Sequence, residues 1–155
     1  MVIKKERGYT VAINAEKIWR YERDSSVRSL IDESIFPYPD GAGAVIGLRW
    51  LYGKKSEKVN MPVRALEAAD HFKFRTFIVG ASKANHELAL KRIIDVYPNI
   101  DLVGNLHGFN SRETIVRQVL SSKPQLILIA MGSPKQEIVA REIISKLHSG
   151  IAIGC

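Results

Sequence analysis

The chain has 155 residues, of which 46% are hydrophobic and 25% charged, and its formal net charge at neutral pH is +7. That length suits one domain with a full hydrophobic core, and neither a disordered chain nor a membrane span of ~20 apolar residues fits the composition. The positive charge favours an anionic partner, but the basic residues are scattered and form no nucleic-acid module, so nucleic acid is not expected.

The chain begins with a pattern that predicts a strand followed at once by a helix. Residues 9–13 have the composition of a buried strand. In "NAEKIWRYERD" the helical spacing puts Ala15, Ile18 and Trp19 on one apolar face, and Trp19 is expected in the core. Asn14 lies at the junction between strand and helix.

A second short helix is predicted around residues 27–31, before the segment "IFPYPDGAGAV". The prolines and glycines of that segment argue against regular structure and predict that Asp40 lies in a loop. Helical spacing resumes at Val45 and continues past Trp50, which is also expected to be a core residue.

Strands and helices alternate through the rest of the chain. The segment "PVRALEAADHF" predicts a helix that starts at Pro62, and "RTFIVG" a strand. The next helix has a predicted buried stripe of Leu90, Ile93, Ile94 and Tyr97, with His86 on its surface. The strands "IDLVGN", "LILIA" and "GIAIG" follow, separated by helices. This alternation predicts a single α/β domain over residues 1–155, with a Rossmann-like, mostly parallel sheet and helices on both faces.

The segment "LILIAMGSPKQE" allows two interpretations. In one, Ser133 is the N-cap of a helix, Pro134 takes its first position, Gln136 completes a capping box, and the turn only joins two elements. In the other, the free N–H groups of the helix start bind an anion at the carboxyl edge of the sheet, and Lys135 adds positive charge. The segment alone does not choose between them.

Other site classes receive little support. No GxGxxG motif occurs, so a standard dinucleotide site is not predicted. The single cysteine, Cys155, excludes an internal disulfide, and no Cys, His or carboxylate cluster has metal-ligand spacing. We therefore expect neither a metal nor another cofactor. His107, beside Gly108, is a lone loop histidine, which is more often solvated than catalytic.

Four segments taken together resemble the bacterial glycosyltransferases of the WecG/TagA/CpsF family. They are "TVAINAEKI", "YPDGAG", "YPNIDLVGNLHGF" and "AMGSPKQE", and they occur in the family's order and cover nearly all of residues 8–154. "AINAEK" and "AMGSPKQE" are most similar to the branch that transfers N-acetylmannosaminuronic acid in the synthesis of enterobacterial common antigen.

The resemblance implies an inverting hexosyltransferase that needs no metal. It would move an N-acetylmannosaminuronic acid or N-acetylmannosamine unit from UDP to the GlcNAc of an undecaprenyl-diphosphate lipid, at the cytoplasmic face of the inner membrane. The expected partners are therefore a UDP-sugar donor and a lipid-linked acceptor, with peripheral contact to the membrane.

The resemblance also assigns roles to individual residues. Asp40 matches the family's aspartate that acts as general base on the acceptor hydroxyl, although Pro-Asp-Gly is also an ordinary turn. Asn14 matches a pocket asparagine, although it also suits a helix cap. The substrate-binding set implied by the match is Asn14, Gly41, Gly132, Ser133, Lys135, Gln136 and Glu137.

The chain departs from the family's pattern in two respects. Met61 and Val63 stand where the family has Gly and Asp, while Lys58 is kept. Family members also carry a strand and helix before the segment that matches Tyr9, and a basic tail after the last strand. This chain ends "IAIGC", so the resemblance leads us to expect a member shortened at both ends, whose uncovered apolar surface would favour a homo-oligomer.

Three hypotheses therefore stay open from the sequence. The first is the glycosyltransferase, the second is a non-catalytic protein that binds UDP or a UDP-sugar, and the third is an unrelated phosphate-binding α/β protein.

Overall fold

The structure is a computed structural model that describes the backbone of residues 7–52 and 60–155 and the side chains of residues 7–46 and 60–155. The expectations for Lys58 and for the side chain of Trp50 lie outside these residues.

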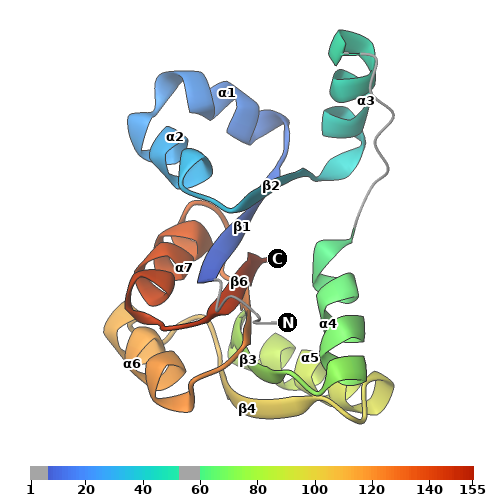
Figure 1. The fold of residues 1–155 in the computed structure, drawn as a ribbon, viewed down its shortest axis with the longest axis vertical. Helices are drawn as coiled ribbons and strands as arrows, with labels where there is room; N and C mark the ends of the chain where they lie inside the picture. The colour runs from blue at the N-terminus through green and yellow to red at the C-terminus, as the bar shows by residue number, and fades with distance from the viewer. Residues whose placement is uncertain (1–6, 53–59) are drawn as a thin grey trace, which may run out of the picture.

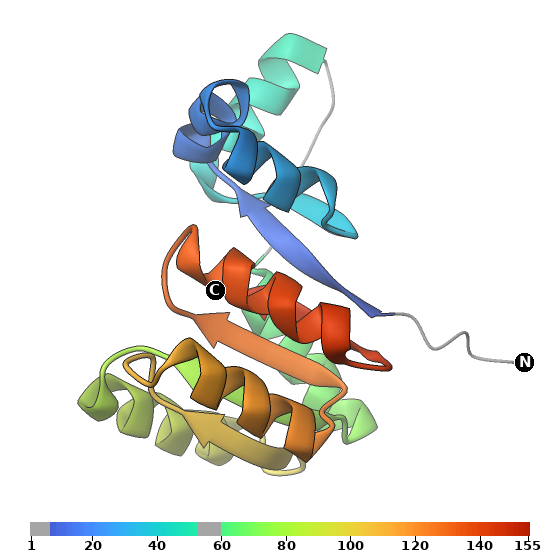
Figure 2. The same ribbon diagram turned by 90° about the vertical axis from the view of Figure 1, so that its left-hand side faces the viewer.

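Six parallel strands form one sheet in the order β2-β1-β6-β5-β3-β4. The strands are β1 (Arg7–Ile13), β2 (Phe36–Pro39), β3 (Arg75–Gly80), β4 (Asp101–Leu106), β5 (Leu126–Ala130) and β6 (Gly150–Gly154). The strand arrows visible in Figure 2 point the same way, so the strands' carboxyl ends share one edge of the sheet. The α/β class predicted from the alternation of strands and helices is confirmed.

Helices cover both faces of the sheet, as predicted. They are α1 (Ala15–Arg23), α2 (Ser25–Asp32), α3 (Gly41–Tyr52), α4 (Met61–Phe72), α5 (Lys83–Val96), α6 (Arg112–Ser122) and α7 (Lys135–Lys146). Helices α6 and α7 lie on one face of the sheet and α4 and α5 on the other (Figures 1 and 2). The β4–β5 and β5–β6 connections step across the sheet in one direction and the β2–β3 and β3–β4 connections in the other, so right-handed crossovers put their helices on opposite faces.

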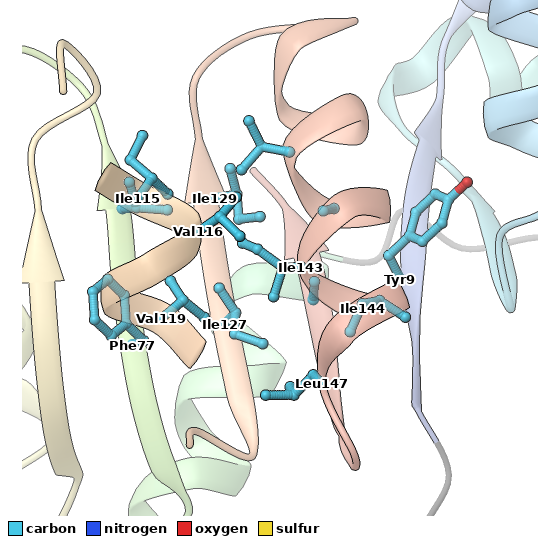
Figure 3. Close-up of a cluster of buried hydrophobic side chains, with 14 of the residues drawn as sticks. Tyr9, Phe77, Ile115, Val116, Val119, Ile127, Ile129, Ile143, Ile144 and Leu147 are labelled. Carbon is cyan, nitrogen blue, oxygen red and sulfur yellow. The ribbon is translucent and has the colours of Figure 1, made fainter. Parts of the chain in front are cut away.

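The larger hydrophobic core lies between the sheet and helices α6 and α7 (Figure 3). Ile115 and Val119 of α6 and Ile143 of α7 are fully buried against Ile127 and Ile129 of β5. These helix residues recur at a spacing of three or four along their helices, which is the period of a face turned toward a sheet. A second cluster packs α4 and α5 on the opposite face, so the central strand β5 is buried on both sides.

The proline-rich segment forms regular structure, contrary to the prediction. Phe36–Pro39 is strand β2, and α3 begins directly after Asp40. Proline is tolerated in β2 because β2 is an edge strand. A missing N–H on the side of β2 without a neighbouring strand removes no inter-strand hydrogen bond. Asp40 itself lies in neither element, as the sequence indicated.

The apolar face predicted for α1 is also wrong. Ile18 and Trp19 are 52% and 59% exposed, and the guanidinium of Arg23 lies over the indole ring of Trp19. The residue of α1 that is buried is Lys17. Helical spacing identified the helix but not the side that faces the protein, because a lysine takes the buried position.

The stripe predicted for α5 is partly confirmed. Leu90, Ile93 and Tyr97 pack against the second cluster, whereas Ile94 is half exposed. The buried side chain of this helix is His86, which the sequence placed on the surface.

Candidate active site at the carboxyl edge of the sheet

The fold brings the residues singled out from the sequence to one edge of the sheet. Asn14 follows β1, Asp40 follows β2, and Gly132 lies in the turn between β5 and α7. Strands β2 and β5 are three inter-strand spacings apart, or roughly 14 Å. The candidate site is therefore a row of groups along the strand ends, and we call its two parts the β1–β2 end and the β3–β5 end.

At the β1–β2 end, Asp40 is an exposed side chain held by its backbone. Its N–H donates to the carbonyl of Ile13 at 2.8 Å, which continues the ladder between the two strands. The side chain of Asn14 accepts from the N–H of Lys17 at 2.9 Å, so Asn14 is the N-cap of α1. Gly41 has a φ of +83°, a conformation that favours glycine, and begins α3 immediately after the aspartate.

An apolar hollow lies beside the β1–β2 end. It has a volume of about 230 Å³, and most of its lining is apolar surface of α1 and its neighbours. Its lining residues include Ile13, Ile18, Tyr21, Ile31 and Pro37. The partly exposed face of α1 thus borders a cavity that reaches Ile13 at the end of β1 and Pro37 in β2.

The start of α7 corrects the predicted capping box. The helix begins at Lys135, its N-cap is Pro134, and no side chain caps it. Ser133 is therefore not the N-cap, and Pro134 precedes the first helical position. Gly132 has a φ of +76°, and a Cβ there would meet no atom within 4 Å. The N–H of Gln136 donates to the carbonyl of Gly132 at 2.9 Å, whereas the N–H groups of Lys135 and Glu137 have no side-chain cap and can face an anion at the helix start.

A buried ion pair joins the two parts of the site. Lys17 Nζ of α1 lies 2.6 Å from Glu137 Oε1 of α7, and Lys17 and Glu137 are 5% and 3% exposed. The same ammonium donates to the carbonyl of Ala12 at 2.8 Å. Two buried opposite charges this close fix the position of both helices, because separating them would leave each charge desolvated.

Gln136 is packed in the same polar cluster. It is 4% exposed, its Nε2 lies 3.4 Å from Glu137 Oε1, and a Cβ on Gly154 would come within 2.7 Å of that nitrogen. Gln136 Oε1 and Glu137 Oε2 have no hydrogen-bond partner among the residues that the structure describes. Unpaired buried oxygens are uncommon in folded proteins and mark a place where a further polar group would be stabilising.

The β3–β5 end is built from three interlocked turns. Ala81 donates its N–H to the carbonyl of Ala130 at 2.8 Å and accepts from the N–H of Gly108 at the same distance. Lys135 Nζ donates to the carbonyl of Gly108 at 3.3 Å. Gly80 has a φ of +139°, and a Cβ there would fall 2.2 Å from the oxygen of Ala130. The close approach of these turns therefore requires glycine at position 80.

The side chain of His86 contacts the end of β3 and the neighbouring strand β4. Its Nδ1 donates to the carbonyl of Gly80 at 3.0 Å, and its Nε2 lies 3.2 Å from Asn105 Oδ1 of β4. His107, the loop histidine considered from the sequence, accepts from the N–H of Phe109 at 3.3 Å and so shapes its own turn.

Tyr38 of β2 is a further residue of the β1–β2 end. Its hydroxyl donates to the carbonyl of Gly154 at 3.2 Å. Burial, with smaller effects of Cys155, Asp40 and Glu137, raises the pKa of Tyr38 to about 12. The phenol is therefore neutral at physiological pH and acts as a hydrogen-bond donor.

The described residues contain neither a cluster of metal ligands nor a helix that could span a membrane. No group of three or more His, Cys, Asp or Glu side chains there could hold a metal ion. In the same ranges, no helix has the length and apolar character needed to cross a membrane.

Sequence reasoning missed Lys17, His86 and Phe109. Lysine and histidine on predicted helices are taken as surface residues unless a partner is known, and the partners here come from other elements. Phe109 is 81% exposed, and only its position just after a strand end could have drawn attention to it.

The family model described as "Glycosyl transferase WecG/TagA/CpsF family" matches residues 1–155. The match covers the whole chain, including every residue of the carboxyl-edge row. The motifs that suggested the resemblance are the strand ends and turns of that row. The chain therefore belongs to the WecG/TagA/CpsF glycosyltransferase family.

Proposed function

We propose that the chain transfers an N-acetylmannosaminuronic acid or N-acetylmannosamine unit from UDP to GlcNAc-diphospho-undecaprenol, with inversion at the anomeric carbon. The reaction would belong to the synthesis of a cell-surface polysaccharide of the enterobacterial common antigen type. The family match supports the reaction class, and the similarity of "AINAEK" and "AMGSPKQE" to one branch supports the choice of sugar. The protein would act at the cytoplasmic face of the inner membrane, where that acceptor lipid is presented.

On the acceptor side, Asp40 is the proposed general base. The acceptor hydroxyl loses its proton to the carboxylate as its oxygen attacks the anomeric carbon. Asp40 is exposed at the end of β2, so a large lipid-linked acceptor can approach it. The side-chain oxygen of the adjacent Asn14 caps helix α1, so the amide NH₂ of the same side chain would hold a sugar hydroxyl.

On the donor side, the start of α7 is the proposed binding site for the leaving diphosphate. UDP gains negative charge as the glycosidic bond breaks, and N–H groups at a helix start stabilise that charge without reorganisation. Lys135 adds a positive charge beside them, and Gly132 lets the backbone approach closely. Ser133 and the polar pair of Gln136 and Glu137 complete the proposed donor contacts.

The observation that carries the proposal is the arrangement of these groups in one row. An inverting displacement needs the base and the leaving group on opposite sides of the sugar ring. The ends of β2 and β5, roughly 14 Å apart, leave the ends of β1 and β6 between them for a hexose. Asp40 and Lys135 thus lie on opposite sides of the space that the sugar would occupy.

The direct test incubates the purified chain with UDP-N-acetylmannosaminuronic acid, UDP-N-acetylmannosamine and UDP-N-acetylglucosamine, each with a short-chain GlcNAc-diphosphate lipid. We expect transfer of a mannose-configured sugar, and a product whose anomeric configuration is opposite to that of the donor. Retention of configuration would contradict the single displacement, and transfer of only the glucose-configured sugar would contradict the branch.

A non-catalytic UDP-sugar-binding role is the alternative, and one observation favours it. Val63 lies exposed in the first turn of α4, where the family pattern has an aspartate, and Met61 replaces a glycine nearby. UDP-sugar binding without transfer to any acceptor would support this role over catalysis.

A further inference from the structure

Lys17 is a buried cation to which the proposed reaction gives no role. It is 5% exposed, and its ammonium donates to the carbonyl of Ala12 at 2.8 Å, two residues before Asn14. The backbone N–H of Lys17 donates to Asn14 Oδ1 at 2.9 Å. Lys17 therefore bonds both to the end of β1 and to the side chain of Asn14. The second bond occupies the amide oxygen of Asn14, so the NH₂ of that amide is the part that a ligand can meet.

The same ammonium orders two side chains of α7. It lies 2.6 Å from Glu137 Oε1, which also accepts from Gln136 Nε2 at 3.4 Å. Glu137 Oε2 and Gln136 Oε1 are buried and have no hydrogen-bond partner among the residues that the structure describes. The contact with Lys17 thus determines which oxygens of the two side chains stay available to a ligand.

The amide of Gln136 has little space in which to turn. The residue is 4% exposed, and a Cβ on Gly154 would come within 2.7 Å of its Nε2, so β6 packs directly against the amide. A buried acceptor without a partner costs stability unless another group donates to it. Gln136 Oε1 is therefore held in an orientation that the fold alone does not satisfy.

We infer that Lys17 is a positioning residue of the transfer reaction, which acts through Asn14 on the acceptor side and through Glu137 and Gln136 on the donor side. The inference rests on the proposed function, which places those three side chains against the sugars. Lys17 sets one amide with its NH₂ free and the other with its oxygen free. One buried ammonium can serve both sides because it carries three N–H donors.

The test compares Lys17→Met with the parent chain. Calorimetry measures UDP affinity, and a kinetic assay measures sugar transfer from UDP-N-acetylmannosamine to a short-chain GlcNAc-diphosphate lipid. UDP affinity should match the parent's, because the backbone N–H groups at the start of α7 and Lys135 are unchanged. The kcat should fall by about 10²-fold, the effect of a displacement of about 1 Å in the groups that align two substrates. Loss of UDP affinity in parallel with kcat would overturn the inference, because it would show that the whole start of α7 is disturbed.

The double variant Lys17→Met/Glu137→Gln keeps the test decisive if Lys17→Met does not fold. It leaves no charge at this buried place, so it should unfold at a higher temperature than Lys17→Met. Its transfer should stay low, because no ammonium orients the new glutamine. Glu137→Gln alone keeps Lys17 beside an oxygen at position 137 and should transfer faster than the double variant. Equal transfer by these two variants would overturn the inference, since Lys17 would then add nothing.

Two controls separate positioning from a general loss of stability. Arg20→Met removes ion pairs on the same helix, with Glu16 and Asp24, that involve no residue of the candidate site. Ile143→Ala opens a cavity in the core beneath α7 and lowers the unfolding midpoint without changing a polar group. Both should transfer as the parent does at a temperature where every variant is folded. If Ile143→Ala loses as much transfer as Lys17→Met, the effect is one of stability and the inference is wrong.

A spectroscopic readout does not depend on transfer. The side-chain NH₂ groups of Asn14 and Gln136 give separate signals in amide-proton NMR spectra, and Asn14→Asp and Gln136→Glu assign them by removing one each. Both signals should shift in Lys17→Met and neither in Arg20→Met. If the parent transfers no sugar, the proposed function fails, and these shifts still show whether Lys17 orders the two amides. Unshifted signals in Lys17→Met would overturn the inference even if the parent transfers sugar.

Discussion

The two ends of the candidate site are built differently. At the β3–β5 end, three turns are locked by backbone hydrogen bonds through Ala81, and the buried His86 bonds to the turn after β3 from below. At the β1–β2 end, Asp40 is exposed and is fixed by one backbone bond to Ile13, and Ile13 and Pro37 of the same two strands line an open apolar hollow. One end is rigid before any ligand arrives, and the other leaves room around its proposed catalytic group.

The difference matches the two substrates of the proposed reaction. A nucleoside diphosphate is small and always the same, so turns of fixed shape can bind it with little loss of entropy. A lipid-linked acceptor is large and brings its own apolar chain, which an open end can admit. The buried pair of Lys17 and Glu137 connects the ends, because it joins the helix after β1 to the helix after β5.

Breaking that connection should give the largest loss of stability. Lys17→Met leaves the Glu137 carboxylate buried without its counter-charge, and we expect the free energy of unfolding to fall by about 3–5 kcal/mol. Denaturant unfolding measures the change. The double variant Lys17→Met/Glu137→Leu removes both charges and should recover most of the loss.

An exposed pair provides the control. Arg64 and Glu67 are 2.9 Å apart but lie largely in solvent, so Arg64→Met should cost less than about 1 kcal/mol. A loss in Lys17→Met no larger than in Arg64→Met would contradict the connecting role of the buried pair.

Disturbing the rigid end should have a smaller effect on stability. Gly80→Ala forces a side chain into a left-handed conformation against the carbonyl of Ala130, which should cost about 1–3 kcal/mol for the strain and should also weaken UDP binding. Gly43→Ala is the matched control, because its Cβ meets no neighbour and alanine favours a helix. If Gly80→Ala is as stable as Gly43→Ala, the turns after β3 and β5 do not pack tightly against each other.

The sequence predicted the strands and helices better than it predicted individual contacts. Strands such as Arg75–Gly80 and Gly150–Gly154 were predicted correctly, because short apolar runs bounded by turn residues have few alternatives. The strand at Phe36–Pro39 was missed, since its prolines are acceptable only at a sheet edge and the sequence does not reveal strand order.

The candidate site was predicted as a set of positions but not as a network. Turn and helix-start signals placed Asn14 and Gly132 at strand ends and Asp40 in a loop, and the sheet then brings the three positions to one edge. The capping role of Ser133 was wrong, because the helix begins two residues later. The pairing of Lys17 with Glu137 spans 120 residues, and no local pattern in one sequence encodes it.

The smallest expected effect concerns pH. Burial raises the pKa of both Tyr9 and Tyr38 to about 12, above the value of about 10 in an unfolded chain. The folded state therefore holds these protons more tightly, and the stability that they contribute is complete below pH ~10 and is lost as the pH rises toward ~12. An ultraviolet titration of tyrosinate should show Tyr9 and Tyr38 among the late-ionising groups, and Tyr38→Phe should remove one of them. Ionisation of all tyrosines in a single step near pH ~10 would contradict the burial of both hydroxyls.

The most direct measurement compares Asp40→Asn with Lys135→Ala for both UDP affinity and sugar transfer. A general base acts on the acceptor proton and does not hold UDP, so Asp40→Asn should keep the parent's UDP affinity and lower transfer by about 10² to 10⁴. Lys135→Ala should weaken UDP binding itself, by about tenfold for a charge-assisted contact. If Asp40→Asn transfers sugar as fast as the parent, Asp40 is only a turn residue, and the division of the site into a donor end and an acceptor end is wrong.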